Sequence, residues 1–193
     1  MRRLARLLVE TALPCIVAVV GVAAVAPLPG ARADDPSPLF ALVDAATQRL
    51  QTAEPIAAAK WRSGASIEDA TRVQQVLNSV AAAAATRGVD PDRVRGFFED
   101  QIAATEAIEY MRFAEWKLDP SAAPVSPPDL AASRAAIDVI NHTMIDQIAL
   151  QWPLLNGLGC RAALDGALTE VIHARGLDPF YQQALSFATR SYC

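Results

Sequence analysis

The sequence predicts an all-α protein, a single domain of about six helices. Long segments such as residues 101–117 contain good helix formers without glycine or proline. Capping residues and prolines punctuate the chain at intervals typical of helix ends. The alternating apolar and polar pattern of β-strands is not found. A chain of 193 residues has room for one domain with a substantial hydrophobic core.

Residues 1–33 have the pattern of a secretory signal peptide. A basic start, MRRLAR, precedes an apolar stretch from Leu13 to Leu28 and a small-x-small site at 31–33. An uncleaved membrane anchor is the alternative, but the stretch is interrupted by proline and glycine and is short for a spanning helix of ~20 residues. We therefore expect cleavage after Ala33, export to the periplasm or beyond, no membrane association afterwards, and a mature domain of residues 34–193.

The first helical segment begins near Ser37 or Pro38 and continues to Leu50. Pro55 must then kink this helix or start a new one, because proline lacks the N–H of a helix interior. The second part ends near Gly64, a plausible C-terminal cap.

Two further helices follow in the first half of the chain. Ser66 and Asp69 have the spacing of a capping box, which predicts a helix to about Arg87. Asp90-Pro91 predicts the start of the longest helix, which continues to about Leu118.

The remaining residues predict three more helices. Four prolines within residues 120–128 indicate a stiff connector. Asp129 then caps a helix to about Trp152, where Pro153 intervenes. Short helices are expected at about 160–175 and 178–191.

Charge and cysteine content narrow the functions that the mature chain can have. Residues 34–193 contain 13 basic and 20 acidic side chains, a net charge of about −7, so we expect no nucleic-acid partner. Cys160 and Cys193 are the two cysteines that remain after cleavage. Export to an oxidising compartment favours a disulfide between them, with two free thiols as the alternative.

Several polar residues have spacings that bring them onto shared helix faces. Arg49 and Lys60 are 11 positions apart, close to three helical turns. Thr105 and Glu109 are four apart within an otherwise apolar helix. Either pair can be explained by a solvated stripe on the surface, and either can also belong to a polar pocket inside the helical core.

Three more polar residues are equally ambiguous from spacing alone. Asp69 and Arg72 are three apart, which suits a capping residue with a weak ion pair, and Arg134 can simply be solvated. The two histidines lack a metal-ligand pattern, and neither a nucleophile elbow nor a phosphate-binding loop is present. Binding of a partner protein by an exposed helix face is a further function that the residues do not exclude.

The order of these residues resembles the all-helical, AroQ-class chorismate mutases. Similarity to the exported gamma subclass, and to its mycobacterial secreted members, covers essentially the whole mature chain. It is carried by LVDAATQRL, KWR, IEDATRVQQ, FFEDQIAATEAIEYMRF, KLDP, PPDLAASRAAID and the terminal SYC. The resemblance implies a helical bundle that rearranges chorismate to prephenate, the branch point toward phenylalanine and tyrosine. It implies neither a cofactor nor a metal.

The resemblance also assigns roles to the ambiguous residues. Arginine forks suit carboxylates, so three arginines are expected to hold the substrate's two carboxylates: Arg49, Arg72 and Arg134. Lys60 and Glu109 are expected at the ether oxygen as the catalytic pair.

The other two site residues have binding roles by the same resemblance. Thr105 is expected to bind a carboxylate, and Asp69 to hold the hydroxyl end of the substrate or to orient its cationic neighbours. The sequence departs from several cytosolic members at Val73 and Val76, near the expected hydroxyl site, which leaves Gln75 or backbone groups for that role.

The assembly and the rival function are predicted on the same basis. A homodimer is expected, with each site completed within one chain because Arg134 comes from the C-terminal half. The alternative function is a secreted helical interaction protein on the same scaffold, without turnover. A small-anion binding protein is a third reading, and it predicts chorismate binding without prephenate formation.

Overall fold

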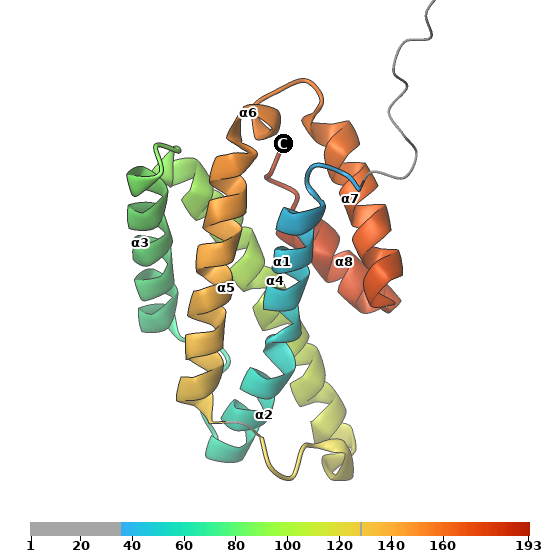
Figure 1. The fold of residues 1–193 in the computed structure, drawn as a ribbon. Coiled ribbons are helices and arrows are strands. Elements are labelled where there is room, and N and C mark those ends of the chain that lie inside the picture. The colour runs from blue at the N-terminus through green and yellow to red at the C-terminus, as the bar shows by residue number, and fades with distance from the viewer. Residues whose placement is uncertain (1–35, 128) are drawn as a thin grey trace, which may run out of the picture. The chain divides into compact units, whose positions relative to one another are not determined.

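The fold is that of a computed structural model, which describes residues 36–127 and 129–193 (Figure 1). The predicted signal peptide and its cleavage site lie outside these residues. Within them the chain forms eight α-helices and one short 3-10 helix, and no strand. The all-α prediction is therefore confirmed. None of the helices described is both long and apolar enough to cross a membrane.

The first helical segment is two helices rather than one. α1 (Phe40–Gln51) and α2 (Ala53–Ser63) follow one another along nearly one line, separated at Thr52 (Figure 1). Because Pro55 has no N–H, the carbonyl of Gln51 loses its usual partner and the helix is interrupted there. Gly64 ends α2 with φ 67°, a left-handed conformation that favours glycine.

The predicted capping box before α3 is wrong. α3 (Ala70–Thr86) is capped by Asp69, whose Oδ1 accepts from the backbone N–H of Arg72 at 3.0 Å. Ser66 lies in an irregular segment instead, because the buried Ile67 offers its carbonyl oxygen to Nζ of Lys60 and fixes the loop before the helix.

The caps of the next two long helices are confirmed. Asp90 caps α4 (Pro91–Leu118), and Asp129 caps α5 (Leu130–Leu150). A 3-10 helix, η1 (Pro120–Ala122), follows α4.

The C-terminal part contains one helix that the sequence did not predict. The single-turn α6 (Trp152–Leu155) stands apart from α5, because Pro153 lacks the N–H that would continue the longer helix. α7 (Cys160–Arg175) and α8 (Pro179–Ala188) complete the chain.

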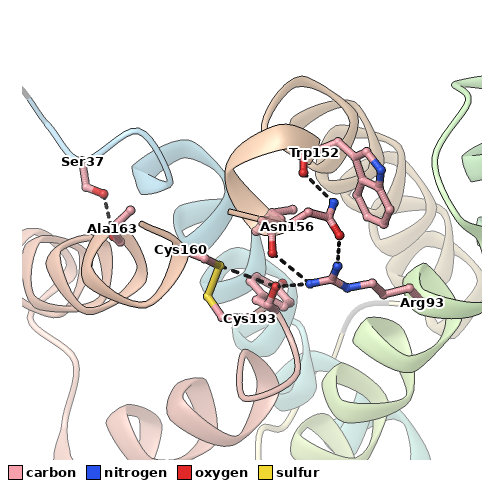
Figure 2. Close-up of a disulfide and its surroundings, with 9 residues drawn as sticks. Ser37, Arg93, Trp152, Asn156, Cys160, Ala163 and Cys193 are labelled. Atoms are coloured by element: carbon pink, nitrogen blue, oxygen red, sulfur yellow. Dashed lines mark hydrogen bonds between the residues drawn. A yellow bond between two sulfur atoms is a disulfide. The ribbon is translucent and has the colours of Figure 1, made fainter. Parts of the chain in front are cut away.

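Figure 2 shows how the C-terminus is attached to the rest of the domain. Cys160 and Cys193 form the predicted disulfide, with an S–S distance of 2.04 Å. Arg93 donates from Nη2 to the carbonyl oxygens of Leu155 and Tyr192, at 2.9 and 3.0 Å. These contacts join α4, α6 and the last residues of the chain.

The main hydrophobic core surrounds α1, which packs against α4, α5, α7 and α8 (Figure 1). α3 lies on the opposite side of α5, and packs on both α4 and α5. The largest fully buried core side chains include Leu42, Leu50, Phe97, Phe98 and Tyr192. This packing holds α1 to α5 around the polar site described next.

Candidate active site

A solvent-open cavity lies among α1 to α5 and the loop before α3. All five helices and that loop contribute residues to its lining. All seven residues predicted for the site line it, and all come from one chain: Arg49, Lys60, Asp69, Arg72, Thr105, Glu109 and Arg134. Apolar side chains of α2, α3, α4 and α5 fill the spaces between them.

α4 provides one wall of the cavity. Ile102, Thr105, Glu106 and Glu109 recur at three- and four-residue intervals, so they share a face of the helix. Thr105 and Glu109 are buried, and they therefore belong to an internal polar pocket rather than to a solvated stripe.

Lys60 and Glu109 form a buried ion pair at this wall. Nζ of Lys60 lies 2.8 Å from Oε2 of Glu109 and 2.5 Å from the carbonyl oxygen of Ile67. Burial raises the pKa of Glu109 above its ordinary value, although the hydrogen bond from Lys60 acts in the opposite direction. The carboxyl group therefore holds a proton to a higher pH than an exposed glutamate does.

Arg72 and Arg134, which also line the cavity, each contact a carboxylate. Nη2 of Arg134 lies 2.6 Å from Oδ2 of Asp69, and Nη2 of Arg72 lies 2.6 Å from Oδ1 of Asp138. The backbone N–H of Arg72, and then the nearby Arg134, lower the pKa of Asp69. Asp69 is thus ionised and connects the start of α3 to α5.

Arg49 differs from the other cations of the cavity. Its Nε donates to Oδ1 of Asn141 at 3.0 Å, and its Nη1 donates to Oγ1 of Thr105 at 3.1 Å. Thr105 in turn donates to the carbonyl oxygen of Gln101. Burial lowers the pKa of Arg49 to about 10, so the guanidinium stays charged at neutral pH.

The sequence did not identify three polar neighbours of the site. Asp138 and Asn141 hold Arg72 and Arg49 from α5, and Glu106 lines the cavity from α4. Burial and the charge of Glu68 raise the pKa of Glu106. The spacing of Arg134, Asp138 and Asn141, four and then three residues, is a stripe on one face of α5 that could have been recognised.

The two valines at which the sequence departs from the cytosolic family members also lie at the cavity. Val73 and Val76 both line it, whereas Gln75 is exposed and does not. Gln75 is therefore a poor candidate for contact with a ligand, and Glu106 is a better one.

The arrangement suits a small ligand with two separated negative groups. Four cations face one cavity, and three of them have guanidinium groups that can donate two parallel hydrogen bonds to a carboxylate. Lys60 and Glu109 lie together at one side, where a proton donor can meet an oxygen atom of the ligand.

Fold and cavity together define an all-helical domain with a cationic cavity that suits a small anion. Residues 40–110 match the family described as chorismate mutase type II. A secreted chorismate mutase of Mycolicibacterium smegmatis is 56% identical over 165 residues, covering 86% of this chain and 91% of the relative. The chain belongs to the chorismate mutase family.

One further relative and one solved structure support the same family assignment. A secreted chorismate mutase of Mycobacterium tuberculosis is 52% identical over 171 residues, covering 88% of this chain and 86% of the relative. The crystal structure of a chorismate mutase from Burkholderia thailandensis superposes with a TM-score of 0.76 at 33% identity. That match covers 81% of this chain and 99% of the solved one.

Proposed function

We propose that this protein is an exported chorismate mutase, which converts chorismate to prephenate by a cofactor-free Claisen rearrangement. The observation that carries this proposal is the buried pair of Lys60 and Glu109, in a cavity that also contains three arginines. The family assignment and the description of both mycobacterial relatives as secreted support the activity and the export.

The reaction needs positioning and electrostatic stabilisation rather than a nucleophile. The substrate is a small dianion that must adopt a compact conformation before one C–O bond breaks and one C–C bond forms. Negative charge grows on the ether oxygen as the C–O bond lengthens. A preorganised cavity with fixed donors at that oxygen lowers the barrier without a covalent intermediate.

Arg49, Arg72 and Arg134 bind the two carboxylates in this proposal. At an effective dielectric constant near 20, one cation 4 Å from a carboxylate contributes ~4 kcal/mol before desolvation. Several such contacts together can exceed the cost of taking the dianion out of water. Thr105 donates to a carboxylate beside Arg49 when its hydroxyl turns away from the carbonyl oxygen of Gln101. Asp69 keeps Arg134 in place by their 2.6 Å contact.

Lys60 and Glu109 act on the ether oxygen. Nζ of Lys60 donates to this oxygen and stabilises the growing charge. Glu109 donates from the other side when it is protonated, which its raised pKa favours. An ionised Glu109 would instead repel the developing charge, so its proton is needed for full activity.

Glu106 is the candidate that we propose for the substrate hydroxyl. It lines the cavity three residues before Glu109 on the same face of α4, and a carboxylate accepts well from a hydroxyl group. Val73 and Val76 close the neighbouring side with apolar surface only.

The site does not require a second subunit in this proposal, because all seven residues line one cavity of one chain. The homodimer stays a prediction, and sedimentation of the purified protein would determine the oligomeric state.

The test is chorismate consumption by the purified, oxidised protein, compared with variants Lys60→Ala and Arg134→Ala. Fast loss of chorismate with prephenate as product, and collapse of the rate in both variants, supports the enzyme. A folded parent that binds chorismate without forming prephenate indicates an anion-binding protein. A folded parent that does neither indicates an interaction protein.

A further inference from the structure

Arg49 is the one cavity cation without a carboxylate within 4.0 Å among the residues that the structure describes. Lys60, Arg72 and Arg134 contact Glu109, Asp138 and Asp69 respectively. Arg49 is nevertheless deeply buried, with 3% of its surface exposed. Burying a charge without a carboxylate in contact is costly. Asp138 and Glu109 act on Arg49 only from a longer distance, so the neutral groups that touch it need an explanation.

Two neutral groups hold the guanidinium in place. Asn141 accepts from Nε, Thr105 accepts from Nη1, and the ring of Phe98 lies 5.9 Å from Cζ. Asn141 and Thr105 are the side chains that accept hydrogen bonds from Arg49 in the described part of the chain. Nη2 is therefore available to a ligand in the cavity that Arg49 lines. The side chain is therefore oriented without being neutralised.

Arg49 and Arg72 differ in the charge of the acceptor that each one meets on α5. Asp138 and Asn141 are three residues apart on α5, and each accepts from one arginine of the site. An aspartate and an asparagine have nearly the same shape, but only the aspartate cancels the charge of its partner. Asn141 is 5% exposed, and its neutral amide adds no negative charge in contact with Arg49, which leaves the guanidinium a stronger attraction for a bound anion than an aspartate at this position would.

We infer that Asn141 is a positioning residue, which orients Arg49 without placing a carboxylate against it, so that a substrate carboxylate can take that contact. This inference rests on the proposed function, because it assigns Arg49 to a carboxylate of chorismate. The charge of that carboxylate is the same in the ground state and the transition state, so Asn141 acts on KM more than on kcat.

The test is the isosteric variant Asn141→Asp, in the full protein with its disulfide oxidised. It keeps the acceptor for Nε of Arg49 and adds a charge that neutralises the guanidinium. We expect KM for chorismate to rise by about tenfold or more, kcat to stay within about threefold of the parent, and Tm to be unchanged or higher. Substitution of a residue with a purely structural role would lower Tm, and would not raise KM alone.

Asn156→Asp is the matched control. Asn156 also accepts from an arginine, Arg93, but at the C-terminal end of the domain, away from the cavity (Figure 2). We expect its KM to equal that of the parent. A matching rise in KM in this variant overturns the inference, because the effect would then not depend on Arg49.

The remaining outcomes each decide the question. An unchanged KM in a folded Asn141→Asp variant overturns the inference while the proposed function stands. A parent without turnover overturns the proposed function, and the inference with it. If Asn141→Asp does not fold, Asn141→Ala removes the acceptor without adding charge, and an unchanged KM in that variant also overturns the inference.

Discussion

Nζ of Lys60 lies 2.8 Å from Oε2 of Glu109, and both side chains are nearly excluded from solvent. Within the described residues, the only other acceptor for this ammonium group is the carbonyl oxygen of Ile67. The loop before α3 and the middle of α4 therefore fix Lys60 from two directions. A substrate that enters the cavity meets a donor whose position is already set, which is the condition for electrostatic catalysis.

Removal of the Lys60 ammonium group should reduce kcat strongly. Loss of one donor to a developing oxyanion typically costs about 10²–10³ in kcat, and we expect Lys60→Ala to fall in or beyond this range. Steady-state kinetics with chorismate measures it. Lys117→Ala, at the exposed C-terminal end of α4, is the matched control and should retain the parent rate. A Lys60→Ala variant with near-parental kcat would exclude Lys60 from the chemical step.

The pH dependence of turnover should report the protonation of Glu109. Because its pKa is raised by burial, we expect activity to be high while the carboxyl group is protonated and to fall as pH rises through that pKa. Glu109→Gln keeps a donor at all pH values, so its profile should be flat over the same range. The profile of Glu99→Gln, an exposed glutamate of α4, should match that of the parent. A Glu109→Gln profile identical to the parent's would contradict the proposed role.

Mixing two inactive variants should not restore activity. Lys60 and Arg134 line the same cavity of one chain, so neither Lys60→Ala nor Arg134→Ala can borrow the missing residue from another chain. We expect the mixed proteins, after unfolding and joint refolding, to show only the sum of their residual rates. Arg161→Ala, an exposed arginine of α7, should lose nothing by itself. Recovery of about a quarter or more of the parent rate would show that chains exchange site residues.

Loss of the disulfide should lower stability with little effect on the site. The bond closes a loop with a sequence separation of 33 residues, for which the chain-entropy model gives about 3–4 kcal/mol. We expect Cys160→Ser with Cys193→Ser to lose about this much free energy of unfolding, measured by urea denaturation. Reductant should lower the parent to the same value and leave the double variant unchanged. Equal stability of the parent and the double variant would contradict the prediction.

Much of the fold could be predicted because helix ends have local chemical signals. Asp90-Pro91 and Asp129 each mark a start that the structure confirms. The capping box at Ser66 failed because a tertiary contact, the hydrogen bond from Lys60 to Ile67, decides the path of that loop. Such a contact has no signature in the neighbouring sequence.

The site was harder to predict than the fold. Spacing alone left Arg49 and Lys60 as either surface cations or site residues, since the faces that two helices turn toward each other depend on packing. Resemblance to a family brought the seven residues together, and the structure places all of them at one cavity. The spacing of Asp138 and Asn141 indicates that they share a face of α5 with Arg134, but the arginine that each one contacts depends on how the helices pack.

The seven site residues extend from Arg49 in α1 to Arg134 in α5, although they line a single cavity. Isolated helices can form within microseconds, but this cavity exists only after α1 to α5 have docked across long sequence separations. The rate at which turnover returns during refolding therefore reports the rate of tertiary assembly. Helical circular dichroism should return first, and the delay before the first prephenate appears measures how long α1 to α5 take to assemble around the cavity.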